Sequence, residues 1–310
     1  MSLISVVTPC YNEEENVEEL YRQVKEVFAG IGRHTYEHIF IDNASKDRTV
    51  AILKEIAKQD KNVKVIVNAR NFGHIRSPFH AYLQTKGDAV VSLMADLQDP
   101  PALIAEFIRK WEEGYKIVVA VKKNSEESKL MFGLRRLYYS LAQRLSEVEL
   151  LKNFAGFGLY DRRIIEALRQ VDDPYPYFRG LIMEIGFERA EIEYVQSSRK
   201  RGITKNNFYT LYDTAMQGIT GYSKVPLRLA VMLGFSLSLL NIVVALFYLI
   251  YKIMFWYEFS VGMAPLIIGL FFFSSVQLFF IGIVGEYLGA IHTQVVKRPL
   301  VVEKERVNFD

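Results

Sequence analysis

The sequence contains a single cysteine, Cys10, among its 310 residues. One thiol excludes an internal disulfide and fits a reducing compartment. An excess of one charge sign is also missing, because 38 basic residues are balanced by 35 acidic ones. The resulting net charge of +3 gives no reason to expect nucleic acid as a partner.

The N-terminal segment Met1–Asn16 lacks the features of a signal peptide. It has no basic stretch, its apolar run is short, and acidic residues follow at once from Glu13. We therefore expect no cleaved leader. Disorder is excluded as well, since hydrophobic residues make up 50% and aromatic residues 13% of the chain.

Two long apolar runs lie near the C-terminus, Leu227–Phe255 and Met263–Ile291. A helix needs about 20 apolar residues to cross a bilayer core, and both runs reach that length. The link Trp256–Gly262 is too short for a domain, so the runs predict an antiparallel membrane hairpin. The alternative, two buried helices of a soluble core, is disfavoured because soluble helices rarely stay apolar on every face.

Basic residues predict how this hairpin is oriented. The link Trp256–Gly262 contains Glu258 and neither Lys nor Arg, and Lys252 close to it is the one exception. The other ends of the two runs are flanked by Lys224, Arg228, Lys297, Arg298, Lys304 and Arg306. We expect both termini and the large N-terminal domain to be cytoplasmic, at a bacterial inner membrane.

Between the two parts lies Asn206–Ser223, whose apolar residues recur at helical spacing. These residues are Phe208, Leu211, Tyr212, Ala215, Met216 and Ile219. The stripe either packs on the soluble domain or lies in the membrane interface. The predicted division is a catalytic domain over 1–205, a juxtamembrane helix over 206–225, two membrane helices over 226–291 and a tail over 292–310. We expect a fragment ending at Val225 to fold and bind nucleotide.

The first part of the chain alternates strand and helix signals, which predicts a mostly parallel α/β sheet with helices on both faces. The predicted strands are Leu3–Thr8, His38–Ile41, Val63–Val67 and Ala89–Met94. The predicted helices are Glu14–Phe28, Thr49–Gln59 and one that includes Phe79–Gln84.

The segments that follow these four strands carry the expected chemistry, because ligands of such sheets bind at the carboxyl ends of the strands. In chain order they read PCYNEEEN, DNASKD, NARNFG and ADLQDPP. None has the glycines and lysine of a P-loop, and three contain acids. Such acids suit a divalent cation that bridges a diphosphate, or the hydroxyls of a ribose. The simpler interpretation, that Asp and Asn only form turns there, fits one segment better than four.

With these motifs the sequence resembles a family-2 glycosyltransferase of the GT-A fold, and most of all the polyprenyl-phosphate glycosyltransferases. That group includes dolichyl-phosphate mannose synthase and bacterial undecaprenyl-phosphate glucosyltransferases. The resemblance covers nearly the whole chain. It rests on Val7–Glu13, Ile41–Asp47, Arg70–Gly73, Ala95–Pro101, Gly156–Arg162, Arg199–Gly202 with Thr204 and Lys205, Gly285–Gly289 and Lys297–Pro299.

The resemblance implies where the nucleotide sugar binds. Pro9, Tyr11 and Glu13 are expected to hold the nucleoside, and Asp42 is expected near the base or the ribose. Asp96 is expected at the diphosphate.

The resemblance also implies a divalent cation, Mg²⁺ or Mn²⁺, held by Asp96 with Gln98 and Asp99. Members of the family usually have Asp-x-Asp, whereas the first acid is replaced by Met94 here. The predicted metal site therefore has one carboxylate fewer, for which Gln98 or Asp99 compensates, or metal dependence is weaker.

Four basic residues complete the implied site. Arg199 and Lys205 are expected on a mobile loop over the phosphates, and Arg135 or Arg136 is expected at the acceptor phosphate. Many relatives carry an acid where this chain has Gly156. A protein base is not needed, because a polyprenyl phosphate is already an anion at neutral pH.

The sequence thus predicts an enzyme that transfers a sugar, with inversion, from a nucleotide sugar, in particular a UDP-sugar such as UDP-glucose, to undecaprenyl phosphate at the cytoplasmic leaflet. One alternative is a processive polysaccharide synthase, but its Gln-x-x-Arg-Trp motif and additional membrane helices are missing. Another alternative is a binding or scaffold protein that has lost catalytic activity. It is suggested by Met94 and Gly156, which stand where relatives carry acids. Small residues in the first apolar run, such as Gly234, also predict homo-oligomerisation through the hairpin or the tail.

Overall fold

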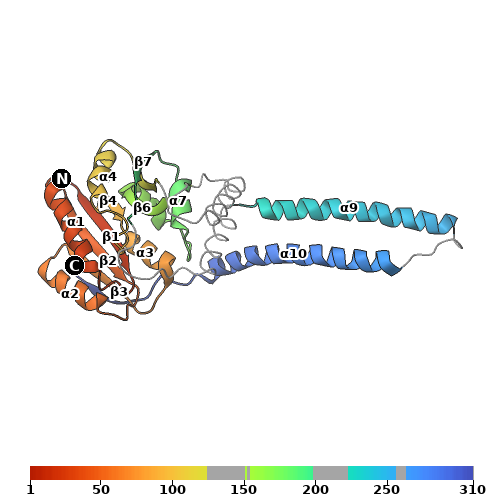
Figure 1. Ribbon diagram of the computed structural model, residues 1–310, viewed down its shortest axis with the longest axis horizontal. Coiled ribbons are helices and arrows are strands. Elements are labelled where there is room, and N and C mark those ends of the chain that lie inside the picture. The colour runs from red at the N-terminus through yellow and green to blue at the C-terminus, as the bar shows by residue number, and fades with distance from the viewer. Residues whose placement is uncertain (124–150, 152–153, 198–222, 256–262, 310) are drawn as a thin grey trace.

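The computed structural model consists of an α/β domain from which two long helices project (Figure 1). It describes residues 1–123, 151, 154–197, 223–255 and 263–309. The strands are β1 Leu3–Cys10, β2 Thr35–Asp42, β3 Val63–Asn68, β4 Ala89–Ser92, β5 Ile117–Lys122, β6 Phe154–Asp161, β7 Arg189–Tyr194 and β8 Glu303–Val307. The helices are α1 Val17–Ile31, α2 Thr49–Gln59, α3 Gly73–Leu83, α4 Leu103–Glu112, α6 Arg162–Arg169, α7 Phe178–Glu184, α9 Val225–Met254 and α10 Met263–Val296.

The strands form one sheet in the order β7-β5-β6-β4-β1-β2-β3-β8. Strands β1 to β4 are mutually parallel, while β6 runs antiparallel to β4 and β8 antiparallel to β3. From β1 the chain first builds outward through β2 and β3, and it then returns to place β4 on the other side of β1. This reversal is a topological switch point, where open α/β sheets bind ligands beyond the strand ends.

Helices cover both faces of the sheet, which confirms the predicted fold class (Figure 1). On one face α1, α2 and α4 bury apolar residues such as Leu20, Leu53 and Phe107 against the strands. On the other face α3, α6 and α7 do the same, with Phe79 among their buried residues. The apolar positions of α1 recur every three or four residues, so a single stripe of that helix is buried.

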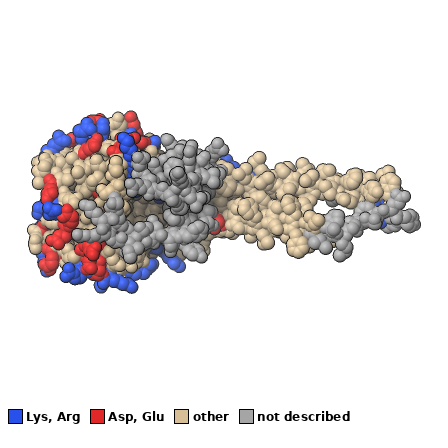
Figure 2. Space-filling view, viewed as in Figure 1, with Lys and Arg blue, Asp and Glu red and all other residues tan. Residues whose placement is uncertain are grey.

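The predicted pair of apolar helices is confirmed as α9 and α10. Each is long and apolar enough to cross a membrane, and neither apolar window is buried within the protein. Figure 2 shows the charged side chains gathered on the α/β domain, while the described part of the hairpin is nearly free of them. The hydroxyl of Tyr287 in α10 donates to the carbonyl of Ser223, 2.6 Å away, directly before α9. Helix α10 therefore extends beyond the start of α9 toward the domain.

The C-terminal segment is more than a tail, contrary to the division predicted from the sequence. After α10 the chain returns to the domain and pairs β8 with β3, with Val65 opposite Val307. The N–H of Ala69 donates to the carbonyl of Val302 at 2.9 Å. The amide of Asn308 donates to two backbone carbonyls of the domain. The chain after α10 is thus an integral part of the α/β domain.

This arrangement corrects one expectation from the sequence. A fragment ending at Val225 lacks β8, and it leaves the edge of β3 unpaired. It also lacks Val301, which is only 7% exposed. Such a fragment is not the complete domain, and a variant that tests the role of the hairpin must retain β8.

Candidate functional site

The predicted nucleotide-binding residues follow three adjacent strands of the sheet. Because β1 lies between β2 and β4, the carboxyl ends of these strands meet on one rim. Pro9 is the second-last residue of β1, and Tyr11 and Glu13 follow this strand. Asp42 ends β2 directly opposite Cys10. Asp96 lies in the loop after β4. The fold therefore brings together segments that are far apart in the sequence.

Each of the three loops on this rim contains a non-glycine residue with a left-handed backbone. These residues are Asn12 with φ 55°, Ala44 with φ 61° and Leu97 with φ 56°. A residue with a side chain adopts this conformation at a cost, and such strain is concentrated at functional sites. The strained backbone of these three loops therefore supports a functional role for this rim of the sheet.

The loops after β1 and β2 hold each other in place through hydrogen bonds. The N–H of Asn12 donates to Ser45 Oγ at 2.8 Å, and the N–H of Lys46 donates to Asn12 Oδ1 at 2.8 Å. The N–H of Glu13 donates to Thr49 Oγ1 at 2.9 Å. Glu13 in turn accepts from the amide of Asn16 at 2.7 Å. These hydrogen bonds thus fix the backbone of the segment predicted to bind the nucleoside.

Asp42 is fully buried at the end of β2. One of its oxygens accepts from the Ser45 hydroxyl and the other from the Ser45 N–H. Burial raises the pKa of Asp42 above its ordinary value, and the hydrogen bonds from Ser45 oppose that rise. The carboxyl group is therefore oriented by its own loop, and its contact with a base or a ribose stays a prediction.

Asn43 is a site residue that the sequence motifs did not single out. Its amide nitrogen donates to Asn71 Oδ1 and to the carbonyl of Gly73, while its oxygen accepts from the N–H of Phe72 and the amide of Asn68. One buried side chain thus joins the loops after β2 and β3. The sequence draws attention to Asn43, because it belongs to the DNASKD segment. The sequence does not reveal that its hydrogen-bond partners lie in the loop after β3.

The loop after β4 carries the three predicted metal residues, and the structure separates them. Asp96 and Gln98 are partly exposed, whereas Asp99 is only 2% exposed. The N–H of Gln98 donates to Asp96 Oδ1 at 3.2 Å, which closes the turn. Asp99 Oδ1 instead accepts from the Tyr194 hydroxyl at 2.6 Å and from the Gln196 amide at 3.2 Å. Asp99 therefore connects this loop to the end of β7.

The donor set fits a divalent cation that is bound mainly through its substrate. Among the described residues no three Asp, Glu, His or Cys side chains are grouped to hold a metal ion. Magnesium commonly takes only one or two carboxylates from a protein and fills its remaining positions with phosphate oxygens and water. The carboxylate of Asp96 and the amide oxygen of Gln98 are hard oxygen ligands of this kind, which Mg²⁺ and Mn²⁺ both accept.

The same loop is tied to the segment that leads into the predicted phosphate clamp. The N–H of Ser197 donates to the carbonyl of Gln98 at 3.2 Å. The amide of Gln98 donates back to the carbonyl of Ser197 at 3.3 Å. The predicted clamp residues Arg199 and Lys205 follow soon after but lie outside the described residues, as do Arg135, Arg136 and the juxtamembrane segment before Ser223.

Gly156 lies in β6 with φ 100°. Its carbonyl accepts from the Tyr160 hydroxyl at 2.9 Å. A β-carbon there would have space around it, but a residue other than glycine is strained at this φ. The local backbone therefore favours glycine, so the missing acid is part of a consistent local structure.

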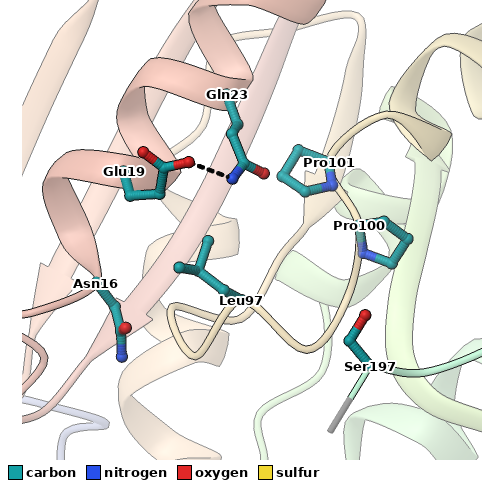
Figure 3. A pocket seen from close by; sticks show the side chains of 7 residues that line it. All are labelled: Asn16, Glu19, Gln23, Leu97, Pro100, Pro101 and Ser197. Atoms are coloured by element: carbon teal, nitrogen blue, oxygen red, sulfur yellow. Dashed lines mark hydrogen bonds between the residues drawn. The ribbon is translucent and has the colours of Figure 1, made fainter. Parts of the chain in front are cut away.

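A pocket of about 400 Å³ lies beside the Asp96 loop (Figure 3). It opens between α1 and the turn 97–101, and its lining comprises Asn16, Glu19, Gln23, Leu97, Pro100, Pro101 and Ser197. None of Pro9, Tyr11, Glu13, Asp42 and Asp96, the predicted nucleotide-binding residues that the structure describes, lines it. It adjoins the rim through Leu97, which follows Asp96, and through Asn16, which binds Glu13.

We expect that Tyr194→Phe destabilises the protein by about 1.5–3 kcal/mol, because it removes a hydrogen bond to a buried carboxylate. Burial already raises the pKa of Asp99, and the Tyr194 hydroxyl opposes that rise. The matched control is Tyr115→Phe, since the Tyr115 hydroxyl has no hydrogen bond within the described residues. Thermal melting of the two purified variants measures the difference, and equal melting temperatures would count against the bond.

Comparison with known proteins gives a consistent result. Residues 5–169 match the sequence model of Glycosyl transferase family 2. The uncharacterized glycosyltransferase YkcC of Bacillus subtilis is 34% identical over 99% of this chain and 94% of its own length. The bactoprenol glucosyl transferase of Shigella phage SfX is 31% identical over 98% of this chain and 99% of its own length.

Among solved structures, glucosyl-3-phosphoglycerate synthase from Mycobacterium tuberculosis superposes with a TM-score of 0.50 at 20% identity. The match covers 71% of this chain and 76% of the synthase. That crystal structure contains Mn²⁺, UDP and phosphoglyceric acid. At this identity the likeness supports the fold only.

Proposed function

The chain belongs to glycosyl transferase family 2, and from this premise we propose that it transfers a sugar from a UDP-sugar to undecaprenyl phosphate at the cytoplasmic face of the membrane. One observation carries the proposal. An acidic strand-end rim of nucleotide-sugar type and two membrane-length helices occur in one chain, which is similar over almost its whole length to a bactoprenol glucosyl transferase.

The acceptor explains why the enzyme has a hairpin. A polyprenyl chain cannot leave the bilayer, so the sugar donor has to be brought to the membrane surface. After α10 the chain adds β8 to the sheet of the α/β domain, which keeps the domain beside the bilayer. We propose that both termini are cytoplasmic, because the basic residues flank that side of the hairpin. We also propose that the protein forms homo-oligomers through the hairpin or the C-terminal segment.

In the proposed mechanism the chain's residues bind and orient the donor. Pro9, Tyr11 and Glu13 hold the nucleoside on the fixed backbone of the β1 loop, and Asp42 accepts hydrogen bonds from the base or the ribose. A Mg²⁺ or Mn²⁺ at Asp96 and Gln98 would neutralise charge on the diphosphate. A divalent cation is consistent with the fold, since the mycobacterial synthase was crystallised with Mn²⁺ and UDP.

Transfer itself exchanges one bond for another at the anomeric carbon. An oxygen of the lipid phosphate forms a bond to this carbon while the bond to the β-phosphate oxygen of UDP breaks. Attack from the opposite face inverts the configuration, and UDP leaves with the bonding electron pair. No proton has to be removed from the acceptor, which is consistent with glycine at position 156. We propose that Arg199 and Lys205 stabilise the departing diphosphate, and that Arg135 or Arg136 binds the acceptor phosphate.

The full chain in lipid nanodiscs, supplied with undecaprenyl phosphate and a panel of nucleotide sugars, tests this function. We expect one UDP-sugar to give a lipid-linked monosaccharide with release of UDP. A growing polymer would instead support the processive alternative. Tight UDP binding without any turnover over the whole panel would support the scaffold alternative and overturn the proposal.

A further inference from the structure

Three arginines gather where the hairpin returns to the domain, and they are called the arginine cluster below. They are Arg70 in the loop after β3, Arg76 in α3 and Arg298 just after α10. Arg70 and Arg76 share the ring of Phe72, with their guanidinium carbons 4.0 Å and 5.4 Å from its centroid. Segments far apart in the sequence therefore bring like charges to one place.

No carboxylate pairs with the arginine cluster within the described part of the chain. The acids beside it are already engaged with other cations. Asp172 pairs with Lys297 at 2.5 Å, and Glu303 pairs with His80 and Arg306. Grouping unpaired charges of one sign costs free energy, and an anion bound between them offsets that cost.

The hydrogen bonding of Arg76 is a second indication that the cluster binds a ligand. Its guanidinium donates to the carbonyl of Pro299, which joins α3 to the returning chain. Its Nε is buried and has no hydrogen-bond partner among the described residues. Burial, followed by Arg70 and Arg298, lowers the pKa of Arg76 from its ordinary value. A buried N–H without an acceptor is uncommon, and an oxygen ligand would satisfy it.

The position of the cluster identifies the source of that anion. Helix α10 contains one charged residue, Glu286, and the first cations beyond it are Lys297 and Arg298. The candidate membrane span Ile268–Val296 ends directly before these cations. A bilayer that contains this span would place them beside the lipid headgroups, where anionic lipids attract basic side chains.

The reacting phosphates are expected at a different part of the rim from the arginine cluster. Arg70 follows β3, whereas Asp96 follows β4, and three steps between neighbouring strands separate these ends. At about 4.8 Å for each step, the separation along the rim is about 14 Å. The acceptor phosphate has to reach the sugar at the diphosphate, which favours a ligand other than the reacting phosphates at the arginine cluster.

We propose that the arginine cluster binds the phosphate of an anionic membrane phospholipid and thereby holds the strand-end rim against the bilayer. The proposal depends on membrane insertion of the hairpin and does not depend on the transfer reaction. Its ligand differs from both substrates, so binding can be measured without turnover.

The experiment titrates the purified full chain in detergent with phosphatidylglycerol, phosphatidylcholine or undecaprenyl phosphate and counts bound lipids by native mass spectrometry. We expect wild type to prefer phosphatidylglycerol over phosphatidylcholine. Arg298→Gln should weaken phosphatidylglycerol binding about fivefold, the effect of about one basic residue at a membrane surface. Lys297→Gln is the matched control, because Lys297 is already paired with Asp172.

Arg76→Gln serves as a second variant, with hydrogen exchange of β8 as a check that the returning chain stays in place. Equal phosphatidylglycerol affinity in wild type and both arginine variants would overturn the proposal. A selective loss of undecaprenyl phosphate binding would assign the cluster to the acceptor instead. A loss of UDP affinity would assign it to the donor site, and either result would also overturn the proposal.

Discussion

Replacing Asp96 with asparagine should lower the rate of sugar transfer by about 100-fold or more, while the protein stays folded and in the membrane. Asp96 is the residue predicted to lie at the diphosphate, and it is partly exposed in the strained loop after β4. In the proposed site, its loss would leave the donor diphosphate without a carboxylate-held cation. Asparagine has nearly the same size, so the change tests charge rather than packing.

The control for this variant is Asp88→Asn. Asp88 directly precedes β4, at the end of the strands opposite to the Asp96 loop. There it accepts a hydrogen bond from the N–H of Leu3 at 2.9 Å. Its replacement by asparagine preserves an acceptor and should leave transfer unchanged. Initial rates are measured over a range of Mg²⁺ and Mn²⁺ concentrations. Near-normal turnover of Asp96→Asn at saturating metal would show that the metal site lies elsewhere.

Asp99→Asn tests whether Asp99 binds a metal ion or only positions the loop after β4. Because burial raises its pKa in the folded protein, Asp99 contributes stability below its unfolded pKa that is lost as pH rises through the folded pKa. At neutral pH the buried charge is therefore a cost, and asparagine still accepts from Tyr194. If Asp99 only positions the loop, we expect this variant to be at least as stable as wild type and to keep its metal affinity. Weaker metal binding would support the metal role predicted from the sequence.

Much of the fold follows from local patterns in the sequence. The periodicity of strands and helices locates β1 to β4 and α1 to α3, and strand-end chemistry places Asp42 and Asp96 on the same rim of the sheet. What remained hidden depends on contacts between distant segments. Asn43 and Asp99 occur in motifs that suggest ligand contact, yet their hydrogen bonds reach other loops of the protein.

The strand β8 was missed for a different physical reason. Its sequence, EKERV, is mostly charged, and four of its five residues would predict an exposed tail. It is nevertheless an edge strand, where charged side chains face water and the backbone supplies the pairing. Its ion pair between Lys54 and Glu305, 2.6 Å long, joins residues that no local pattern connects.

Removing the hairpin while keeping β8 should uncouple donor binding from transfer at the membrane. The variant joins Ser223 to Lys297 through a flexible Gly/Ser linker of about ten residues, long enough to span roughly 17 Å. It retains the three strand ends of the rim and the pairing of β8 with β3. We expect unchanged UDP affinity and a stable, folded domain. A fragment that stops at Ser223 should melt at a lower temperature, because it lacks β8.

Transfer to undecaprenyl phosphate embedded in a bilayer should fall by about 10²–10⁴-fold in the linked variant, because the hairpin no longer confines the enzyme to the acceptor's surface. A short-chain, water-soluble polyprenyl phosphate is the matched control substrate. With this acceptor, wild type and the linked variant should turn over at similar rates, since the α/β domain carries the chemistry. Full activity of the variant on the bilayer acceptor would show that the hairpin only determines location. Loss of activity on both acceptors would instead show that α9 and α10 help to build the acceptor site.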